Sequence, residues 1–147
     1  MQYSIIFLTI IFLTDLVGMY FGMYSYWWFD MTHHFLGGVF VAMLMWNYLK
    51  GSLPKDNLKK TLVIVGVVSF IGVMWEFAEY IASQTLIGPI YNNFGVRAYF
   101  IGDLNDTMND LLMDILGAGL FAWARVLTRR LRRDVDDLIR TAVSELV

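Results

Sequence analysis

The stretch that decides the fold runs from Gly102 to Gly119 and reads GDLNDTMNDLLMDILGAG. It opens an apolar segment long enough to cross a bilayer, yet its first half carries four aspartates. On a helix, Asp106, Asp110 and Asp114 recur every four residues and share one face. A carboxylate near the bilayer centre costs about 2.5–3.5 kcal/mol on insertion scales. A row of carboxylates there therefore requires protons, a water-filled cavity or a bound cation.

The composition excludes several classes of protein. The chain has 147 residues, of which 58% are hydrophobic and 16% charged, which is typical of a membrane protein. It contains no cysteine, so disulfides and thiolate metal sites are excluded. The net charge is −2 and no basic face is evident, which argues against nucleic acid as a partner. The N-terminus lacks a basic region and a cleavage site, so we expect a retained span and not a signal peptide.

The apolar segments predict an all-α, multi-pass protein of the inner or plasma membrane with four transmembrane helices, surrounded by membrane lipids. The predicted spans are about Ser4–Tyr24, Met31–Tyr48, Thr61–Ser83 and Leu104–Leu127. Lysines of the loop 50–60 and arginines of the segment 129–133 mark both as cytoplasmic. Both termini are therefore expected inside, with residues 1–128 as the transmembrane domain. Residues 129–147 are expected to form an amphipathic tail helix, lying on the membrane or pairing with a copy of itself.

Other segments have two interpretations each. Gly18 and Gly22 are spaced for a close helix approach, or occur by chance. The aromatic run 24–29 indicates an interfacial belt, with a ligand cleft as the alternative. Asp15 lies within the first span, where it either bonds to a neighbouring helix or belongs to a polar site. The external segment 84–101 is either a lid or re-entrant piece over such a site or a plain surface loop.

This topology brings polar residues of different spans to the same leaflet. Asp30, His33 and His34 open the second span, and Glu76 and Glu79 lie in the external third of the third span. The acidic row of the fourth span descends from the same side. Carboxylates at the two span starts, positions 30 and 103, have an ordinary alternative as helix N-caps. So many carboxylates cannot all ionise in a low-dielectric space, so protons or a divalent cation must compensate them.

Oxygen and imidazole ligands without sulfur suit Zn²⁺, Mn²⁺, Fe²⁺ or Mg²⁺. The ligands expected first are His34, Glu76, Asp106 and Asp110, and the further candidates are Asp30, His33 and Asp103. Either Glu79 or Asp114 is expected to act as the general base of a catalytic reaction. Arg97 is the one cation predicted on the external side, where it would hold a phosphate or pair with a carboxylate.

The ordered motifs resemble those of a known family. They are Asp30-x-x-x-His34-Phe35, Trp75-Glu76-x-x-Glu79, and Gly102-Asp103-x-x-Asp106-x-x-x-Asp110 ahead of Gly117-Ala118. Over roughly residues 30–119 the chain resembles bacterial inner-membrane proteins of the YjdF type, and more distantly the VanZ-like membrane proteins. It departs from the VanZ-like pattern by doubling the histidine at His33 and by carrying Glu79 where glutamine is more common. The resemblance implies the spans and the polar site but no reaction.

Three functions fit these observations. The first is a metal-dependent hydrolase or transferase acting on a lipid-linked or envelope substrate, since no nucleophile elbow or phosphate loop occurs and activated water is the default. The second is a proton or cation carrier that uses the descending carboxylates as a relay. The third is a structural or sensory protein with a stabilising cation. The one-sided position of the site favours the enzyme, and many small residues make a homodimer a further prediction.

Overall fold

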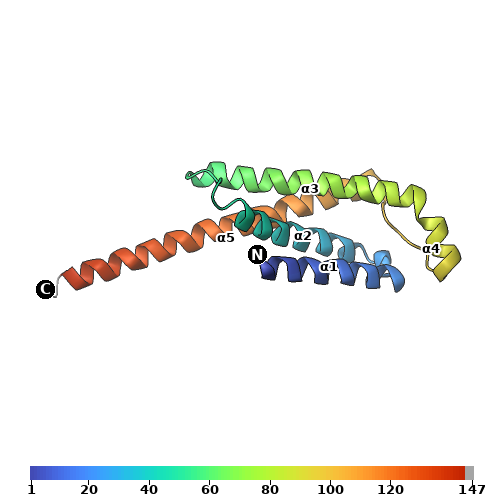
Figure 1. Ribbon diagram of the computed structural model, residues 1–147, viewed down its shortest axis with the longest axis horizontal. Coiled ribbons are helices and arrows are strands. Elements are labelled where there is room, and N and C mark those ends of the chain that lie inside the picture. Colours follow the sequence, from blue (N-terminus) through green and yellow to red (C-terminus); the bar gives the residue numbers. More distant parts are fainter. Residues whose placement is uncertain (145–147) are drawn as a thin grey trace.

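The protein is all-helical in residues 1–144, the part of the chain that its computed structural model describes (Figure 1). The helices are α1 (Gln2–Tyr20), the 3-10 turn η1 (Met23–Ser25), α2 (Trp27–Tyr48), α3 (Asn57–Thr85), α4 (Ile87–Phe94) and α5 (Leu104–Ser144). The predicted all-α class is therefore confirmed. The first helix ends four residues earlier than expected because Gly22 adopts a left-handed conformation, with φ of 69°, and starts the turn η1.

Three helices, α1, α3 and α5, are long and apolar enough to cross a membrane. Helix α2, which corresponds to the second predicted span, is not among them, although its 22 residues match the thickness of a bilayer core. Its polar residues, Asp30, His33, His34 and Asn47, lower its hydropathy. The fourth span thus stays a prediction that rests on the length and the position of α2.

Helix α2 occupies the middle of the bundle. It contacts α1, α3 and α5, with the most extensive contact made to α5, whereas α1 contacts no other long helix. Figure 1 places the N-terminus, the α2–α3 loop and the projecting part of α5 at one end of the bundle, and η1 and α4 at the other. This arrangement gives the basic loop and the basic segment of α5 a common end, as the charge pattern predicts.

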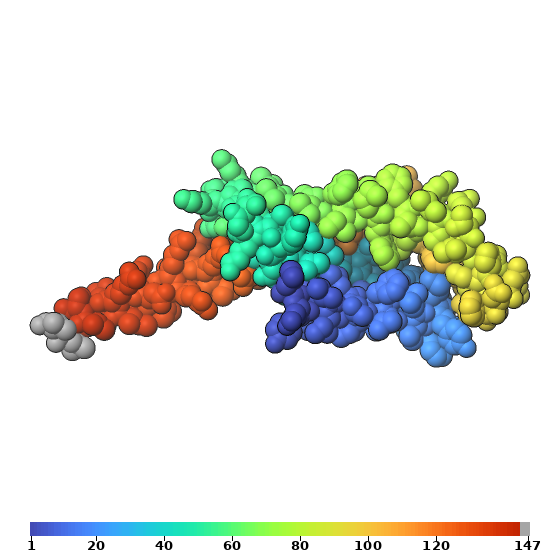
Figure 2. All heavy atoms as spheres, viewed as in Figure 1, coloured from blue at the N-terminus to red at the C-terminus, as the bar shows by residue number. Residues whose placement is uncertain are grey.

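Helix α5 is one rod of 41 residues with no break between positions 128 and 129. The predicted tail is, as far as Ser144, the continuation of this rod, and positions 145–147 of that tail lie outside the described residues. Residues 127–144 are exposed along their whole length, and Figure 2 shows them projecting beyond the packed helices. The expected cytoplasmic location of this part remains a prediction.

Glycines allow α2 and α5 to cross with their backbones in contact. A Cβ added at Gly38 would lie 2.9 Å from the Cα of Asp114, and a Cβ at Gly117 would lie 2.9 Å from the backbone nitrogen of Val39. Neither backbone can move away without separating the helices. The crossing therefore requires a residue without a side chain at both positions, as in other membrane helix pairs.

The end of the bundle near the α2–α3 loop is filled by apolar side chains. The buried members of this cluster are Ala42, Trp46, Ile64, Val68 and Ala118. They come from the later part of α2, the first half of α3 and the middle of α5. The buried acidic side chains and the buried histidine of the same three helices lie toward the opposite end.

The crossing predicts a sharp contrast between two glycines of α5. Gly117→Ala should lower the free energy of unfolding by about 1–3 kcal/mol, because its methyl group would overlap the α2 backbone. Gly119→Ala is the matched control, since no atom lies within 4 Å of its added Cβ, and alanine favours the helix. Thermal melting of the two purified variants in detergent measures the difference. Equal melting temperatures would contradict the proposed crossing.

Candidate metal centre

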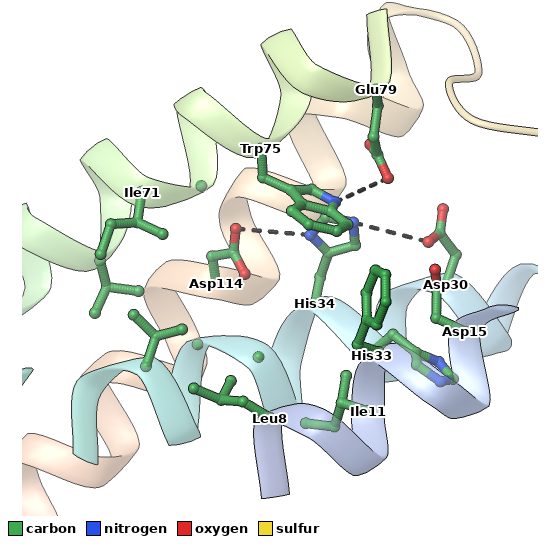
Figure 3. Close-up of a pocket in the computed structure, with 16 residues that line it drawn as sticks. Leu8, Ile11, Asp15, Asp30, His33, His34, Ile71, Trp75, Glu79 and Asp114 are labelled. Carbon is green, nitrogen blue, oxygen red and sulfur yellow. Dashed lines mark hydrogen bonds and ion pairs between the residues drawn. The ribbon is translucent and has the colours of Figure 1, made fainter. Parts of the chain in front are cut away.

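One buried imidazole lies at the centre of the polar end of the bundle. His34 is only 7% exposed, and both of its ring nitrogens face carboxylates (Figure 3). Its Nε2 is 3.7 Å from Oδ1 of Asp30, one helical turn earlier on α2, and its Nδ1 is 3.6 Å from Oδ2 of Asp114 on α5. These separations are ion-pair distances, longer than direct hydrogen bonds.

Two sets of three side chains around His34 have the spacing of metal ligands. The first consists of Asp30, His34 and Asp110, and the second of His34, Glu76 and Glu79. Within each set, one ligand atom of every residue lies within 4.8 Å of the others. The residues come from three helices, so no local sequence motif holds them together. Nitrogen and carboxylate oxygen are donors that zinc, manganese and iron accept.

Buried carboxylate oxygens at this centre have no partner. Glu76 is 7% exposed and Asp110 is 3% exposed. Neither oxygen of Glu76, nor Oδ1 of Asp110, makes a hydrogen bond. Burial of a charged group without a partner costs far more than burial of a neutral one, so such groups are paired, protonated or bound to a metal.

Lysine and arginine do not neutralise this centre. Within residues 1–144, the ion pairs around it are the two that His34 makes, and no lysine or arginine forms one with any of its carboxylates. One imidazole therefore stands against five acidic side chains, those of Asp30, Glu76, Glu79, Asp110 and Asp114. The centre has too few positive charges for its burial.

Asp114 lies where it can orient the imidazole. Its carboxylate packs against Gly72 of α3, where an added Cβ would lie 3.3 Å from its Cγ, and its backbone packs against Gly38. It faces Nδ1 of His34, which leaves Nε2 toward Asp30. A carboxylate behind a metal-binding histidine fixes the tautomer and the ring orientation. This position favours a positioning role for Asp114 over the general base role expected as one alternative from sequence.

Glu79 is held differently. Its Oε1 accepts a hydrogen bond of 2.8 Å from the indole Nε1 of Trp75 on the preceding turn of α3. Both side chains line a cavity beside His34 (Figure 3). Of the two carboxylates considered as a base, Glu79 thus has one oxygen fixed and faces a space that a substrate can enter.

The other predicted site residues lie outside the centre. His33 bonds through Nδ1 to the carbonyl oxygen of Phe29 and through Nε2 to the hydroxyl of Thr14 on α1, so both its nitrogens are used. Asp103 accepts a hydrogen bond from the backbone N–H of Asp106 and acts as a helix N-cap. Arg97 is exposed and forms no ion pair within residues 1–144.

Asp106 lies one turn outside the centre, with Tyr99. The tyrosine hydroxyl donates a hydrogen bond of 3.4 Å to Oδ2 of Asp106, and Gly102 packs against both side chains. Tyr99 also packs against Tyr24, with ring centroids 5.6 Å apart. The segment that follows α4 therefore returns over the outer end of α5, whereas α4 contacts only α3 and does not cover the centre.

Tyr24, in the turn η1, contacts the acidic residue of α1. Its hydroxyl donates a hydrogen bond to Oδ1 of Asp15. Burial, and then this hydrogen bond, raise the pKa of Tyr24 above its usual value, so the phenol stays a donor. Asp15 thus has a partner in the turn after its own helix. Sequence reasoning missed the roles of Tyr24, Tyr99 and Trp75, because an aromatic residue near a membrane surface indicates a belt before it indicates a hydrogen-bond donor.

Two cavities meet at Asp30. The outer one, of about 410 Å³, is lined by polar residues that include Tyr24, Tyr99 and Asp106. The inner one, of about 250 Å³, lies between α1, α2 and α3 and is lined mostly by apolar side chains, with Asp15, Asp30, His34, Glu79 and Asp114 among its polar residues (Figure 3). Because α1 and α3 do not contact each other, the inner cavity is an apolar groove beside the centre.

The fold and the centre define a class: a helical membrane protein with a buried acidic–histidine centre among its spans. Comparison with known families agrees with the first part of this description. Residues 1–132 match the family described as "Predicted membrane protein (DUF2238)", and the chain belongs to that family. No curated protein and no solved structure matches it.

The outer tyrosine offers a test of this geometry. Burial, and the adjacent charge of Asp106, raise the pKa of Tyr99 to about 12. Asp106→Asn should lower this pKa toward the ordinary value of about 10, because it removes the negative neighbour. The measurement is an ultraviolet absorbance titration, with the Tyr99→Phe titration subtracted. In the wild type, stability should fall as the pH rises from the unfolded pKa to the folded one, since the unfolded tyrosine ionises first. An unchanged pKa in Asp106→Asn would contradict the contact.

Proposed function

We propose that the centre binds one divalent cation, with His34, Asp110 and Glu76 as its principal ligands. The observation that carries this proposal is the pair of buried carboxylates with oxygens that lack any hydrogen-bond partner. His34 is common to both ligand sets, and Asp30 and Glu79 complete them. A cation would supply the positive charge that no lysine or arginine provides here within residues 1–144.

We propose further that the protein is a metal-dependent hydrolase or transferase of a lipid-linked substrate. Two features support this choice. A polar cavity and an apolar groove meet at Asp30, which suits a molecule with a charged head and a hydrocarbon tail. A groove of about 250 Å³ is too small for a helix, whose diameter with side chains is about 10–12 Å, and its surroundings in a membrane are lipid.

The chemistry follows from the side chains around the groove. A divalent cation would act as a Lewis acid that makes water acidic enough to lose a proton near neutral pH. Glu79 accepts that proton, while its bond to Trp75 keeps the carboxylate in place. The hydroxide attacks the phosphorus or carbonyl carbon of the substrate, the bond to the leaving oxygen breaks, and Glu79 returns the proton to that oxygen.

The packing argues against the carrier alternative. Apolar side chains fill the bundle between the centre and the α2–α3 loop, so the acidic row has no polar continuation among the described residues. With the basic loop and α5 segment placed in the cytoplasm, as we propose, the centre opens toward the outer leaflet. A plasma or inner membrane location agrees with the charge pattern, and substrates of the outer leaflet would reach the groove from the side.

Metal content tests the first part of the proposal. After loading with Zn²⁺ or Mn²⁺ and desalting, the wild type should retain one ion per chain. Elemental mass spectrometry measures this metal content. His34→Ala and Asp110→Asn should weaken binding by more than about a hundredfold, because both remove a ligand, and Asp114→Asn by about 10–100-fold through loss of orientation.

The matched control is His33→Ala, which removes the neighbouring imidazole without touching either ligand set. It should keep the ion. Metal-free Asp110→Asn should also melt no lower than the metal-free wild type, because the amide replaces a buried charge that has no partner. Equal metal loss in the two histidine variants, or no retained ion in the wild type, would overturn the metal site.

Turnover tests the second part. Metal-loaded protein in detergent should release phosphate from a polyprenyl diphosphate, or the head group from a phospholipid. Glu79→Gln should lower kcat by about 10²–10⁴-fold because it removes the general base, while the three principal ligands, His34, Asp110 and Glu76, should keep the metal bound. Ile71→Trp narrows the apolar groove and should raise KM without changing metal content. If the metal-loaded protein turned over neither lipid, the metal-binding site would still stand, but the proposed enzymatic activity would be contradicted.

A further inference from the structure

At the end of the bundle opposite the metal centre, three cations surround one buried indole. Trp46 of α2 is 2% exposed. Nζ of Lys60 on α3 lies 5.7 Å from its ring centroid, and Cζ of Arg125 and of Arg129 on α5 lie at 5.7 Å and 5.1 Å. Each contact is within the range of a cation–π interaction. Two helices, α3 and α5, thus direct positive charge to the indole of a third.

These cations have no acidic partner in the described part of the chain. Neither Lys60, Arg125 nor Arg129 forms an ion pair or a side-chain hydrogen bond within residues 1–144. Lys60 is only 8% exposed, and a lysine that buried is normally paired. The nearby Asp56 is occupied as a helix cap, since it accepts from the backbone N–H of Lys59. The indole attracts each cation but removes none of their mutual repulsion, and the two arginines are exposed, so an anion from outside the chain can reach them.

We propose that this cluster, formed by Trp46, Lys60, Arg125 and Arg129, binds the phosphate of an anionic membrane lipid. It lies where α2 ends, α3 begins and α5 leaves the packed bundle, which is the level of lipid head groups for a bundle that spans the membrane. Basic pockets between membrane helices bind acidic head groups in this way. On the same two helices, and within two residues of Lys60 and Arg125 in sequence, Leu62 and Trp123 are each 62% exposed and offer an apolar surface for the acyl chains. That surface favours a lipid over a soluble phosphate.

The site is independent of the proposed metal chemistry, because the apolar core separates the two ends. Its test uses purified full-length protein in zwitterionic detergent, with binding of phosphatidylglycerol measured by native mass spectrometry. Phosphatidylcholine is the matched lipid of no net charge. The wild type should bind one phosphatidylglycerol tightly and phosphatidylcholine weakly.

Arg125→Gln combined with Arg129→Gln should lower the affinity for phosphatidylglycerol by about thirtyfold, because two cations leave the head group. The control variant combines Arg130→Gln and Arg133→Gln, which remove the same charge from the same helix at positions that do not contact the indole. It should bind like the wild type. Lys60→Gln removes the third cation from a different helix and should weaken binding as well.

Circular dichroism and metal content verify that each variant is folded, and they should be unchanged. Equal weakening in the two arginine pairs would overturn the site, since the binding would then be a general effect of the basic segment. Equal binding of the two lipids would overturn it too. If inorganic phosphate displaced phosphatidylglycerol at a concentration equal to that of the lipid, the proposal of a lipid ligand would be contradicted, and the ligand would be a soluble anion.

Discussion

The contact between the backbones of α2 and α5 determines where the polar groups of this protein can lie. Gly38 and Gly117 leave no room for a side chain between the two helices. Because the helices approach so closely, Asp110 and Asp114 reach the imidazole of His34, which a wider separation would leave facing hydrocarbon. Gly72 of α3 in turn leaves room for the carboxylate of Asp114. Small residues therefore act here as a condition for the acidic centre, in addition to their usual role in membrane helix packing.

The two ends of the bundle carry an excess of opposite charge. One end holds five carboxylates around one histidine, three of them buried, and the other gathers three cations around Trp46. The apolar core between them prevents the charges from neutralising each other, since salt-bridge distances are far shorter than the bundle is long. We propose a small cation as the partner of the acidic end and a lipid phosphate as the partner of the basic end.

Sequence patterns predicted the class of fold, the membrane character and the gathering of acidic residues, because hydropathy and charge act over whole helices. They ranked His34 ahead of His33 as a ligand but could not say what His33 contacts instead. Adjacent helix positions differ by about 100° in direction, and only the presence of α1 beside His33 decides which imidazole it engages. The four-residue spacing likewise grouped Asp106 with Asp110. In the structure, Asp106 instead accepts a hydrogen bond from Tyr99, which lies in the segment between α4 and α5. These choices depend on contacts between distant segments, which a local pattern does not contain.

The unbroken course of α5 has a mechanical consequence. At 1.5 Å per residue, its 41 residues extend for about 60 Å, roughly twice the thickness of the hydrocarbon layer. The same rigid rod carries two acids of the buried centre and, far beyond the bundle, a solvent-exposed arm. A force that tilts or turns this arm would act as on a lever whose short end holds Asp110 and Asp114, so it would displace these two carboxylates relative to His34.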